Sequence, residues 1–130
     1  MKGTLLVKNV KHLVTCDAND RLLDGVDVFI RDGVIEAIGP VEETAEDVID
    51  ASNMVMYPGL INTHHHLYQT FSRNLPQVQN MELFPWLKTL YEIWKHVDED
   101  VVYYSSLTGM GELLKTGCTT CLDHHYVFPK

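Results

Sequence analysis

Two short apolar segments, each running directly into histidines, are the feature that most restricts how this sequence can fold. Residues 60–63 lead into the histidines at 64–66, and residues 118–122 lead through an aspartate into the histidines at 124–125. Helical patterns separate the two segments, and an order of strand, helices and strand is typical of a βαβ unit with parallel strands. In an α/β barrel the loops that follow the strands build the active site, so these histidines are candidates for chemistry.

The stretch between the two strands predicts a polar loop to about Glu82 and then two helices. Pro85 is expected at the first helical position of one helix, which opens at Phe84. The second helix is expected to begin near Asp98, where three acids face the positive end of its dipole, and to stop at Gly117. The apolar stripes of the two helices are Leu87, Leu90, Tyr91 and Trp94 in the first and Tyr103, Leu107, Met110 and Leu114 in the second.

The residues before Pro58 predict short strands and turns. Asp32-Gly33 lies between two alternating apolar runs, which is a strong signal for a β-hairpin because both turn positions accept positive φ. Further strands are expected at residues 4–7, 12–15, 48–49 and 54–57. We therefore expect a β-sandwich portion over residues 1–57 and the first βα units of an α/β domain over residues 58–130.

Composition and charge exclude several classes of protein. Eighteen acids against ten bases give a formal net charge of −8, and no basic cluster offsets it, so we expect no nucleic-acid partner. No apolar run approaches the roughly 18 residues of a membrane span, and the N-terminus lacks a secretory signal. Three cysteines in β-like segments do not suggest a disulfide framework. A cytoplasmic location is the expectation.

The spacing of the first histidine group predicts a metal site. On a strand, residues i and i+2 face the same side, so His64 and His66 can reach one metal ion while His65 points away. Imidazole suits zinc and iron, and two such ligands need one or two more from elsewhere. The alternative is a polar rim or a chance run of histidines. The position directly after a buried strand that begins Pro58-Gly59 favours the metal site.

The segment Pro58-Gly59-Leu60-Ile61-Asn62-Thr63-His64-His65-His66 resembles the first-strand signature of the amidohydrolase superfamily. These are metal-dependent hydrolases with a (β/α)8 TIM-type barrel and a small β-sandwich made partly from the N-terminus. The segments at residues 68–70, 83–88, 112–114 and 117–126 are similar to the nucleobase-deaminase branch that contains 8-oxoguanine deaminase, with guanine deaminases and triazine hydrolases nearby.

The resemblance implies a metal-dependent aminohydrolase that acts on C–N bonds of cyclic amidines, with His64 and His66 as metal ligands. It implies zinc, with iron as an alternative, and two further histidines and an aspartate on later strands. A barrel takes about 250 residues, whereas 73 follow Tyr57. The expected partner is therefore the remainder of the same enzyme, which would also carry the catalytic residues beyond residue 130, and a homo-oligomer stays open.

The expected reaction is deamination of a free oxopurine such as 8-oxoguanine, with release of ammonia. Hydrolysis of an s-triazine and deamination of guanine are the alternatives within the family, and an inactive structural fragment is the non-enzymatic one. Nucleoside deaminases of a neighbouring branch carry a glutamate that holds ribose, and Pro85 stands at that position here. This difference favours a free base as the substrate, that is, a small nitrogen heterocycle.

Two further side chains are candidates for substrate binding. Gln69 follows the metal histidines by three residues, and its amide can both donate to and accept from a nucleobase edge; the alternative is an ordinary loop amide. Trp86 lies in the first turn of the first helix, where it either covers a planar ring or packs in the core. The residues at 124–126 are interpreted as pocket wall rather than as metal ligands.

The chain is not expected to fold as an isolated monomer. The two predicted barrel strands lack neighbours, and the helix stripes at Leu87, Leu90 and Trp94 and at Tyr103, Leu107 and Met110 would lose their cover. Three or four large side chains left uncovered cost on the order of 5 kcal/mol, which is comparable with the stability of a small domain.

Overall fold

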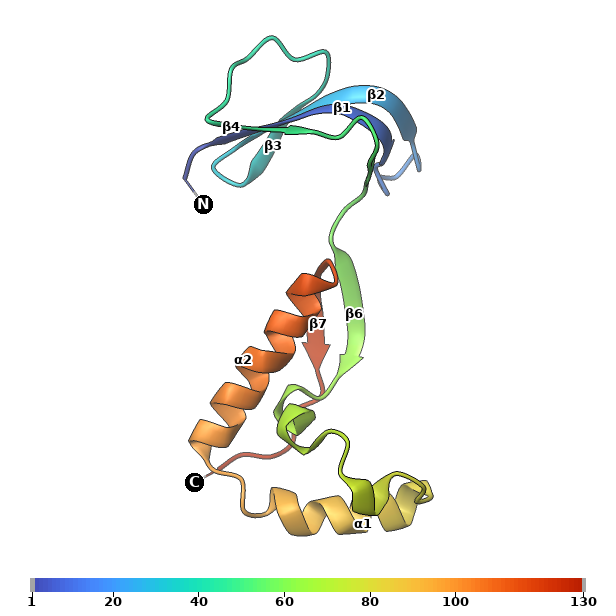
Figure 1. Cartoon of the computed structure of the whole chain (residues 1–130), viewed down its shortest axis with the longest axis vertical. Coiled ribbons are helices and arrows are strands. Elements are labelled where there is room, and N and C mark those ends of the chain that lie inside the picture. Colours follow the sequence, from blue (N-terminus) through green and yellow to red (C-terminus); the bar gives the residue numbers. More distant parts are fainter. Residues whose placement is uncertain (1, 130) are drawn as a thin grey trace. The chain divides into compact units, whose positions relative to one another are not determined.

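The structure is a computed structural model that describes residues 2–129. The chain forms two compact units, Met1–Pro58 and Gly59–Lys130, and their boundary lies one residue after the one expected between residues 57 and 58. Each unit has its own sheet and its own buried core. Figure 1 shows strands alone in the first unit and strands with helices in the second.

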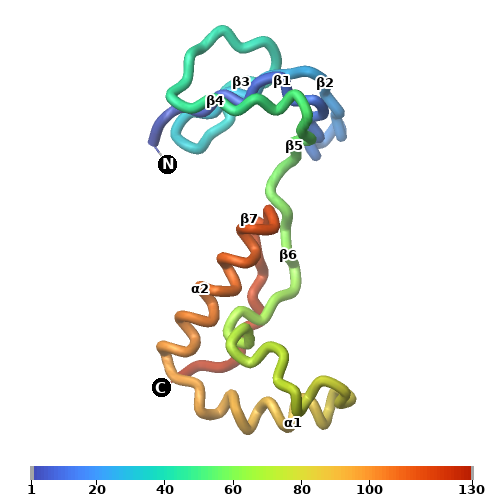
Figure 2. The backbone as a smooth tube through the Cα atoms, viewed as in Figure 1, coloured from blue at the N-terminus to red at the C-terminus, as the bar shows by residue number. Residues whose placement is uncertain are grey.

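The first unit is one five-stranded sheet around a long central strand. Its strands are β1 (Thr4–Val14), β2 (Leu22–Arg31), β3 (Val34–Gly39), β4 (Asp47–Asp50) and β5 (Val55–Met56). The order is β3-β2-β1-β4, and β5 also pairs with β1. Figure 2 traces the backbone from β4 through β5 to β6. β2 is antiparallel to β1 and β3, whereas β4 and β5 run parallel to β1.

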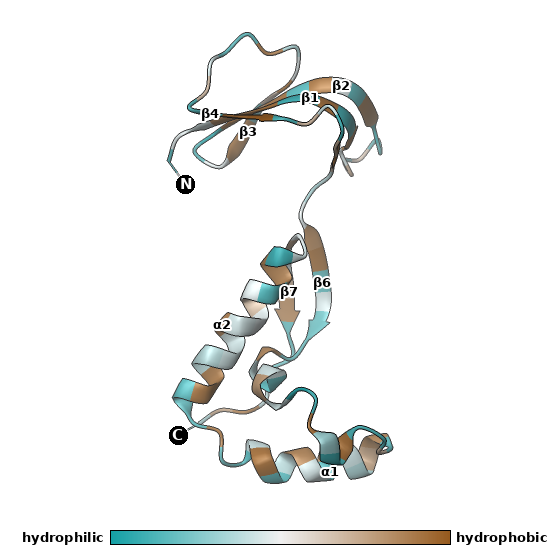
Figure 3. Cartoon of the chain, viewed as in Figure 1, coloured by the Kyte–Doolittle hydropathy of each residue, from teal (hydrophilic) through white to brown (hydrophobic). Residues whose placement is uncertain are grey.

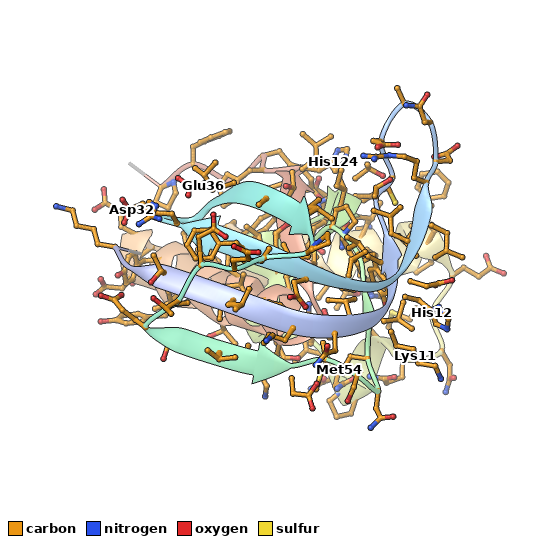
Figure 4. The ribbon with its side chains drawn as sticks, turned by 90° about the horizontal axis from the view of Figure 1, so that it is seen from above. Lys11, His12, Asp32, Glu36, Met54 and His124 are labelled. Atoms are coloured by element: carbon orange, nitrogen blue, oxygen red, sulfur yellow. The ribbon has the colours of Figure 1, made fainter. Side chains whose placement is uncertain are left out.

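The predicted hairpin at Asp32-Gly33 is confirmed. β2 and β3 pair up to Arg31 and Val34, and the two turn residues have φ values of 53° and 82°. The Asp32 carboxylate also accepts a hydrogen bond of 2.9 Å from the backbone N–H of Gly3. The turn is thereby tied to the start of β1, and Figure 4 shows Asp32 at one end of the sheet with His12 at the other.

β1 is one continuous strand, whereas the sequence pattern predicted two. A β-bulge between Val7 and Val10 carries the strand past its polar middle, where Asn9 adopts a φ of 57°. The Asn9 N–H donates to the Asp27 carboxylate at 2.8 Å, so the bulged residue keeps a hydrogen-bond partner. Because β1 has partners on both edges, pairing overrides the break in the apolar pattern. The core of the unit is formed by Val7, Val10, Leu13, Val28 and Ala51.

The strands of the first unit form a single sheet, and no second sheet faces it within residues 2–58. The β-sandwich expected for residues 1–57 is therefore not complete in these residues. Ile35, Ile38 and Val48 are exposed apolar side chains on the strands of this sheet. The sandwich remains a prediction.

The second unit is a βαβ unit, as the sequence predicted. Its elements are β6 (Leu60–His65), the 3-10 helices η1 (Leu67–Ser72) and η2 (Pro76–Val78), the helices α1 (Leu83–Trp94) and α2 (Glu99–Lys115), and β7 (Cys118–Asp123). β6 and β7 pair in parallel. The described residues form this one βαβ unit of a (β/α)8 arrangement, and a closed barrel is not present in them.

Helix α1 begins at Leu83, earlier than the sequence predicted. Pro85 is the third helical residue, and it is tolerated there because the first N–H groups of a helix have no partner inside the helix. The expected polar loop before α1 instead contains η1 and η2, which supply Tyr68 and Val78 to a core with Leu90 and Trp94. These two α1 residues are therefore buried, which corrects the expectation that the stripe on this helix would be uncovered.

Helix α2 has the ends that the sequence predicted. The Asp98 carboxylate accepts a hydrogen bond of 2.9 Å from the N–H of Val101, and Gly117 follows the helix with a φ of 82°. The helix packs against η1 and β7, with Ser105 and Gly109 buried (Figure 1). Its predicted apolar stripe, Tyr103, Leu107, Met110 and Leu114, is exposed. Among the described residues no helix has the length and apolar character needed to cross a membrane.

Candidate metal centre

The parallel pairing of β6 and β7 brings the two histidine groups together. His65 lies opposite Asp123 in the register, so the strands end side by side. Figure 3 shows β6 changing from hydrophobic at its start to hydrophilic at its end. The His64 ring centroid lies 5.1 Å from that of His66 and 4.4 Å from that of His124. Three imidazoles that are up to 60 residues apart in the sequence thus meet at one edge of the sheet.

The side chains of His64 and His66 have the separation that a shared metal ion requires. Their Nε2 atoms lie 3.2 Å apart. Two zinc–nitrogen bonds of about 2.0–2.1 Å at a tetrahedral angle place the nitrogens roughly 3.3 Å apart. The predicted pair therefore fits a zinc ion as two of its ligands. No set of three His, Cys, Asp or Glu residues that could hold a metal occurs in residues 2–129, so further donors are needed.

The hydrogen bonding of His66 leaves the correct nitrogen free for a metal. Its Nδ1 lies 2.8 Å from the backbone oxygen of His124. A carbonyl oxygen only accepts, so Nδ1 carries the proton and the lone pair of neutral His66 is on Nε2. Metal-binding histidines commonly donate their other ring N–H in this way, which fixes both the tautomer and the ring orientation.

His65 faces the other side of the strand, as the alternation predicts. Its ring lies beside Gly109 of α2, and its Nε2 is 3.4 Å from the Arg73 guanidinium. Burial, followed by the charge of Arg73, lowers the pKa of the His65 imidazole. The buried Nδ1 of His65 has no hydrogen-bond partner among the described residues. The His65 ring thus packs beside α2 and does not converge with the rings of His64 and His66.

The second histidine group is occupied by local hydrogen bonds. His124 Nε2 lies 3.3 Å from the backbone oxygen of Thr63. His125 has its Nδ1 3.2 Å from Asp123 and its Nε2 2.6 Å from the backbone oxygen of Val127. Residues 124–126 do not line the cavity beside His64 and His66, so their predicted role as pocket wall is not found, and these contacts instead hold the end of β7 in place.

A cavity of about 640 Å³ opens beside the histidine pair. Both predicted ligands line it, together with Gln69 and Trp86, so all four predicted site residues border the same space. Arg73 is the only lining residue with a permanent charge among the described ones. The volume lies in the range of small-molecule sites, about 300–1,000 Å³. The cavity is lined by His64, His65, His66, Gln69, Ser72, Arg73, Asn74, Leu75, Val78, Gln79, Met81, Leu83, Trp86 and Leu90.

The amide of Gln69 is oriented by two tyrosines. Its Nε2 lies 3.0 Å from the hydroxyl of Tyr68 and 3.0 Å from that of Tyr126. An amide nitrogen has two N–H donors, and in this arrangement both are used. The amide oxygen remains for a ligand, so Gln69 is placed as an acceptor rather than as the paired donor and acceptor that the sequence analysis considered. Burial raises the pKa of the Tyr68 hydroxyl, which keeps it protonated.

Trp86 has surroundings that fit both alternatives left by the sequence. It packs against the core of η1, η2 and α1, with its ring edge-on to Trp94 at a centroid distance of 6.1 Å. It is also half-buried and lines the cavity. Trp94 in turn donates from its indole N–H to the hydroxyl of Ser72 at 3.1 Å, which anchors α1 to η1, the helix that carries Gln69.

Two residues near the histidine pair, Arg73 and Asp123, were not predicted from the sequence. Arg73 lines the cavity. The Asp123 carboxylate accepts a hydrogen bond of 2.8 Å from the N–H of Leu67, the residue that follows His66. The signal available in the sequence was an acid at the end of a strand, directly before a histidine. Its partner is 56 residues away, so spacing alone does not reveal the contact.

Comparison with known proteins identifies relatives. The model of the amidohydrolase family matches residues 55–129. The chain is 44% identical to 8-oxoguanine deaminase of Pseudomonas aeruginosa over 78% of this chain and 24% of that protein. It is 38% identical to hydroxydechloroatrazine ethylaminohydrolase of Pseudomonas sp. strain ADP over 98% of this chain and 29% of that protein.

A solved structure shows the same fold. Atrazine chlorohydrolase from Arthrobacter aurescens TC1, complexed with zinc, superposes with a TM-score of 0.83 and 28% identity over 92% of this chain and 28% of that chain. The chain thus spans less than a third of the length of these relatives. The family match covers more than half of the chain and includes the histidine pair. The chain belongs to the amidohydrolase family.

Proposed function

We propose that this chain supplies the first two metal ligands and one wall of the substrate pocket of a metal-dependent aminohydrolase. The observation that carries the proposal is the pair of Nε2 atoms of His64 and His66, 3.2 Å apart at the side of a cavity of about 640 Å³. A chain of this family that places two imidazoles in this way beside an organic-sized cavity is suited to metal-assisted hydrolysis. With a zinc ion held by His64 and His66, the site would have the chemistry that lowers the pKa of a bound water to about 7 and so would provide a hydroxide nucleophile.

In this proposal the residues of this chain hold the metal and form part of the substrate pocket. Other parts of the enzyme supply the remaining ligands and catalytic groups. His64 and His66 donate Nε2 lone pairs, and the backbone oxygen of His124 keeps His66 in the required tautomer. The proposed partner is the remainder of the same enzyme, which provides the other ligands and the groups that move protons. The exposed apolar stripe of α2 and the exposed side chains of Leu60 and Ile61 support this proposal, because a larger protein would cover them.

The proposed substrate is a free oxopurine such as 8-oxoguanine. Gln69 presents an amide oxygen, which accepts from a ring N–H, and Trp86 offers an aromatic face for a planar ring. The Arg73 guanidinium at the cavity wall suits a substrate with electron-rich oxygen substituents. Pro85 stands where related nucleoside deaminases carry a ribose-binding glutamate, and proline has no carboxylate for that role. This difference favours a free base over a nucleoside. The 44% identity to 8-oxoguanine deaminase is in line with this choice.

A substituted s-triazine is the second candidate substrate. The observation that favours it is the match of 38% identity over nearly the whole chain to hydroxydechloroatrazine ethylaminohydrolase. A triazine is also planar and rich in nitrogen, so it can use the same tryptophan face and the same amide oxygen. Release of an alkylamine instead of ammonia would distinguish the two reactions.

We propose a cytoplasmic location, which the free cysteines support. Cys16 is exposed and free, and Cys118 and Cys121 are also free. Exposed free thiols persist in a reducing compartment, so we place the enzyme in the cytoplasm.

A substrate panel tests the proposal. The full-length protein, loaded with zinc, is assayed for release of ammonia or alkylamine from 8-oxoguanine, guanine, their nucleosides, a pterin and an aminotriazine. We expect the highest kcat/KM for a free oxopurine and little activity after the zinc is removed by a chelator. Faster turnover of a nucleoside than of every free base would contradict the substrate assignment. A zinc-loaded protein that is inactive on all of them would contradict the class of reaction.

A further inference from the structure

The end of β7 holds His66 from both sides. The His66 ring donates from Nδ1 to the backbone oxygen of His124 at 2.8 Å. The next residue, Leu67, donates its N–H to the Asp123 carboxylate at 2.8 Å, and the previous residue, His65, accepts from the N–H of His124 at 2.7 Å. Three consecutive residues around a metal ligand are thus bonded to two consecutive residues of the neighbouring strand.

His66 needs this support because it belongs to no regular element. β6 ends at His65 and η1 begins at Leu67, so His66 has a φ of −130° and a ψ of 80° and makes no side-chain cap to η1. The first N–H groups of a helix have no partner within it, and a carboxylate is a favourable acceptor at that end. Asp123 supplies this acceptor from the adjacent strand and fixes the backbone directly after the ligand.

We propose that Asp123 is a positioning residue for the metal ligand His66. Both carboxylate oxygens are engaged, Oδ1 by the N–H of Leu67 and Oδ2 by the Nδ1 of His125 at 3.2 Å. The side chain is only 24% exposed. Asp123 therefore acts through His66 and not on the metal. The inference rests on the proposed function, because it requires His66 to bind a metal.

Asp98 provides a matched control within the same unit. Its carboxylate also accepts a backbone N–H, that of Val101 at 2.9 Å, but it does so at the start of α2 rather than next to a predicted metal ligand. Asp98→Ala removes the same kind of hydrogen bond as Asp123→Ala. A difference in metal binding between the two variants therefore reports position rather than a general loss of stability.

The test measures zinc affinity by competition with a chelator in the full-length protein and in its Asp123→Ala, Asp123→Asn and Asp98→Ala variants. The absorption spectrum of the cobalt-substituted proteins and the melting temperature of the metal-free proteins are recorded as well. We expect Asp123→Ala to bind zinc about 10–100-fold more weakly, as loss of a partner behind a metal ligand generally does, and to change the cobalt spectrum. Asp98→Ala should match the wild type in both, and Asp123→Asn should recover most of the affinity because its amide oxygen accepts from the N–H of Leu67.

Equal zinc affinity and equal cobalt spectra in Asp123→Ala and Asp98→Ala would overturn the inference. If Asp123→Ala does not fold, Asp123→Glu takes its place, since it keeps the charge but moves the oxygens by one methylene. Tighter zinc binding by Asp123→Glu than by Asp123→Asn would then overturn it. A wild-type protein that binds no zinc would instead refute the proposed function itself, so the two failures are distinguishable.

Discussion

Gly59, directly before β6, is a position where even a methyl side chain is expected to lower the stability of the fold strongly. A Cβ at this position would lie 2.0 Å from Oγ1, 2.4 Å from Cγ2 and 2.7 Å from Cβ of Thr119 on β7. Rotation of the threonine moves Oγ1 and Cγ2 but not its Cβ. Reaching an ordinary contact of 3.4 Å therefore separates the strands by about 0.7 Å. We expect Gly59→Ala to lower the free energy of unfolding by about 3 kcal/mol, at the upper end of the usual cost of overpacking.

Urea unfolding of the full-length protein measures this effect. Gly111→Ala is the matched control, because a Cβ there meets nothing within 4 Å and alanine favours a helix by about 0.5–1 kcal/mol. Adding Thr119→Gly should restore part of the stability that Gly59→Ala removes, as a double-mutant cycle would show. The reasoning would be refuted if Gly59→Ala stayed within about 0.5 kcal/mol of the wild type, the range of neutral surface changes.

Two further predictions concern the first unit. Gly33→Ala should cost about 1–2 kcal/mol by urea unfolding, because the residue has a φ of 82° while its Cβ would meet nothing within 4 Å; an unchanged midpoint would contradict the turn geometry. The backbone N–H and then the hydroxyl of Ser52 lower the pKa of the Asp50 carboxyl, so this group contributes stability above its usual pKa that is lost as the pH falls through the lowered value. Ser52→Ala should raise the pKa of Asp50 only part of the way back, measured by NMR titration, and a full return to the usual value would show that the backbone N–H contributes nothing.

Local signals in the sequence predicted the local parts of the fold. The Asp32-Gly33 hairpin and the two ends of α2 depend on residues within one turn of each other, and each is found as expected. The break expected within β1 is absent, because β2 on one edge and β4 and β5 on the other keep the strand paired through its polar middle. Helix α1 begins at Leu83, earlier than predicted, because proline is tolerated throughout the first turn of a helix. The position of Pro85 therefore does not determine the first residue of the helix.

The candidate site shows the same division between near and distant contacts. The alternation of a strand was enough to pair His64 with His66 and to turn His65 away. The bond from Leu67 to Asp123 joins residues 56 apart, and the bond from Gln69 to Tyr126 joins residues 57 apart. No spacing rule reveals such contacts, because they exist only once β6 and β7 lie side by side.

The central claim is that His64 and His66, and not His65, bind the metal. Elemental analysis of the purified full-length protein and its His64→Ala, His66→Ala and His65→Ala variants tests this most directly. The Nε2 atoms of His64 and His66 converge to 3.2 Å, whereas His65 faces α2 beside Gly109. We expect zinc to be lost from His64→Ala and His66→Ala and largely retained by His65→Ala. Equal zinc loss in all three variants, or full retention in all three, would contradict the account.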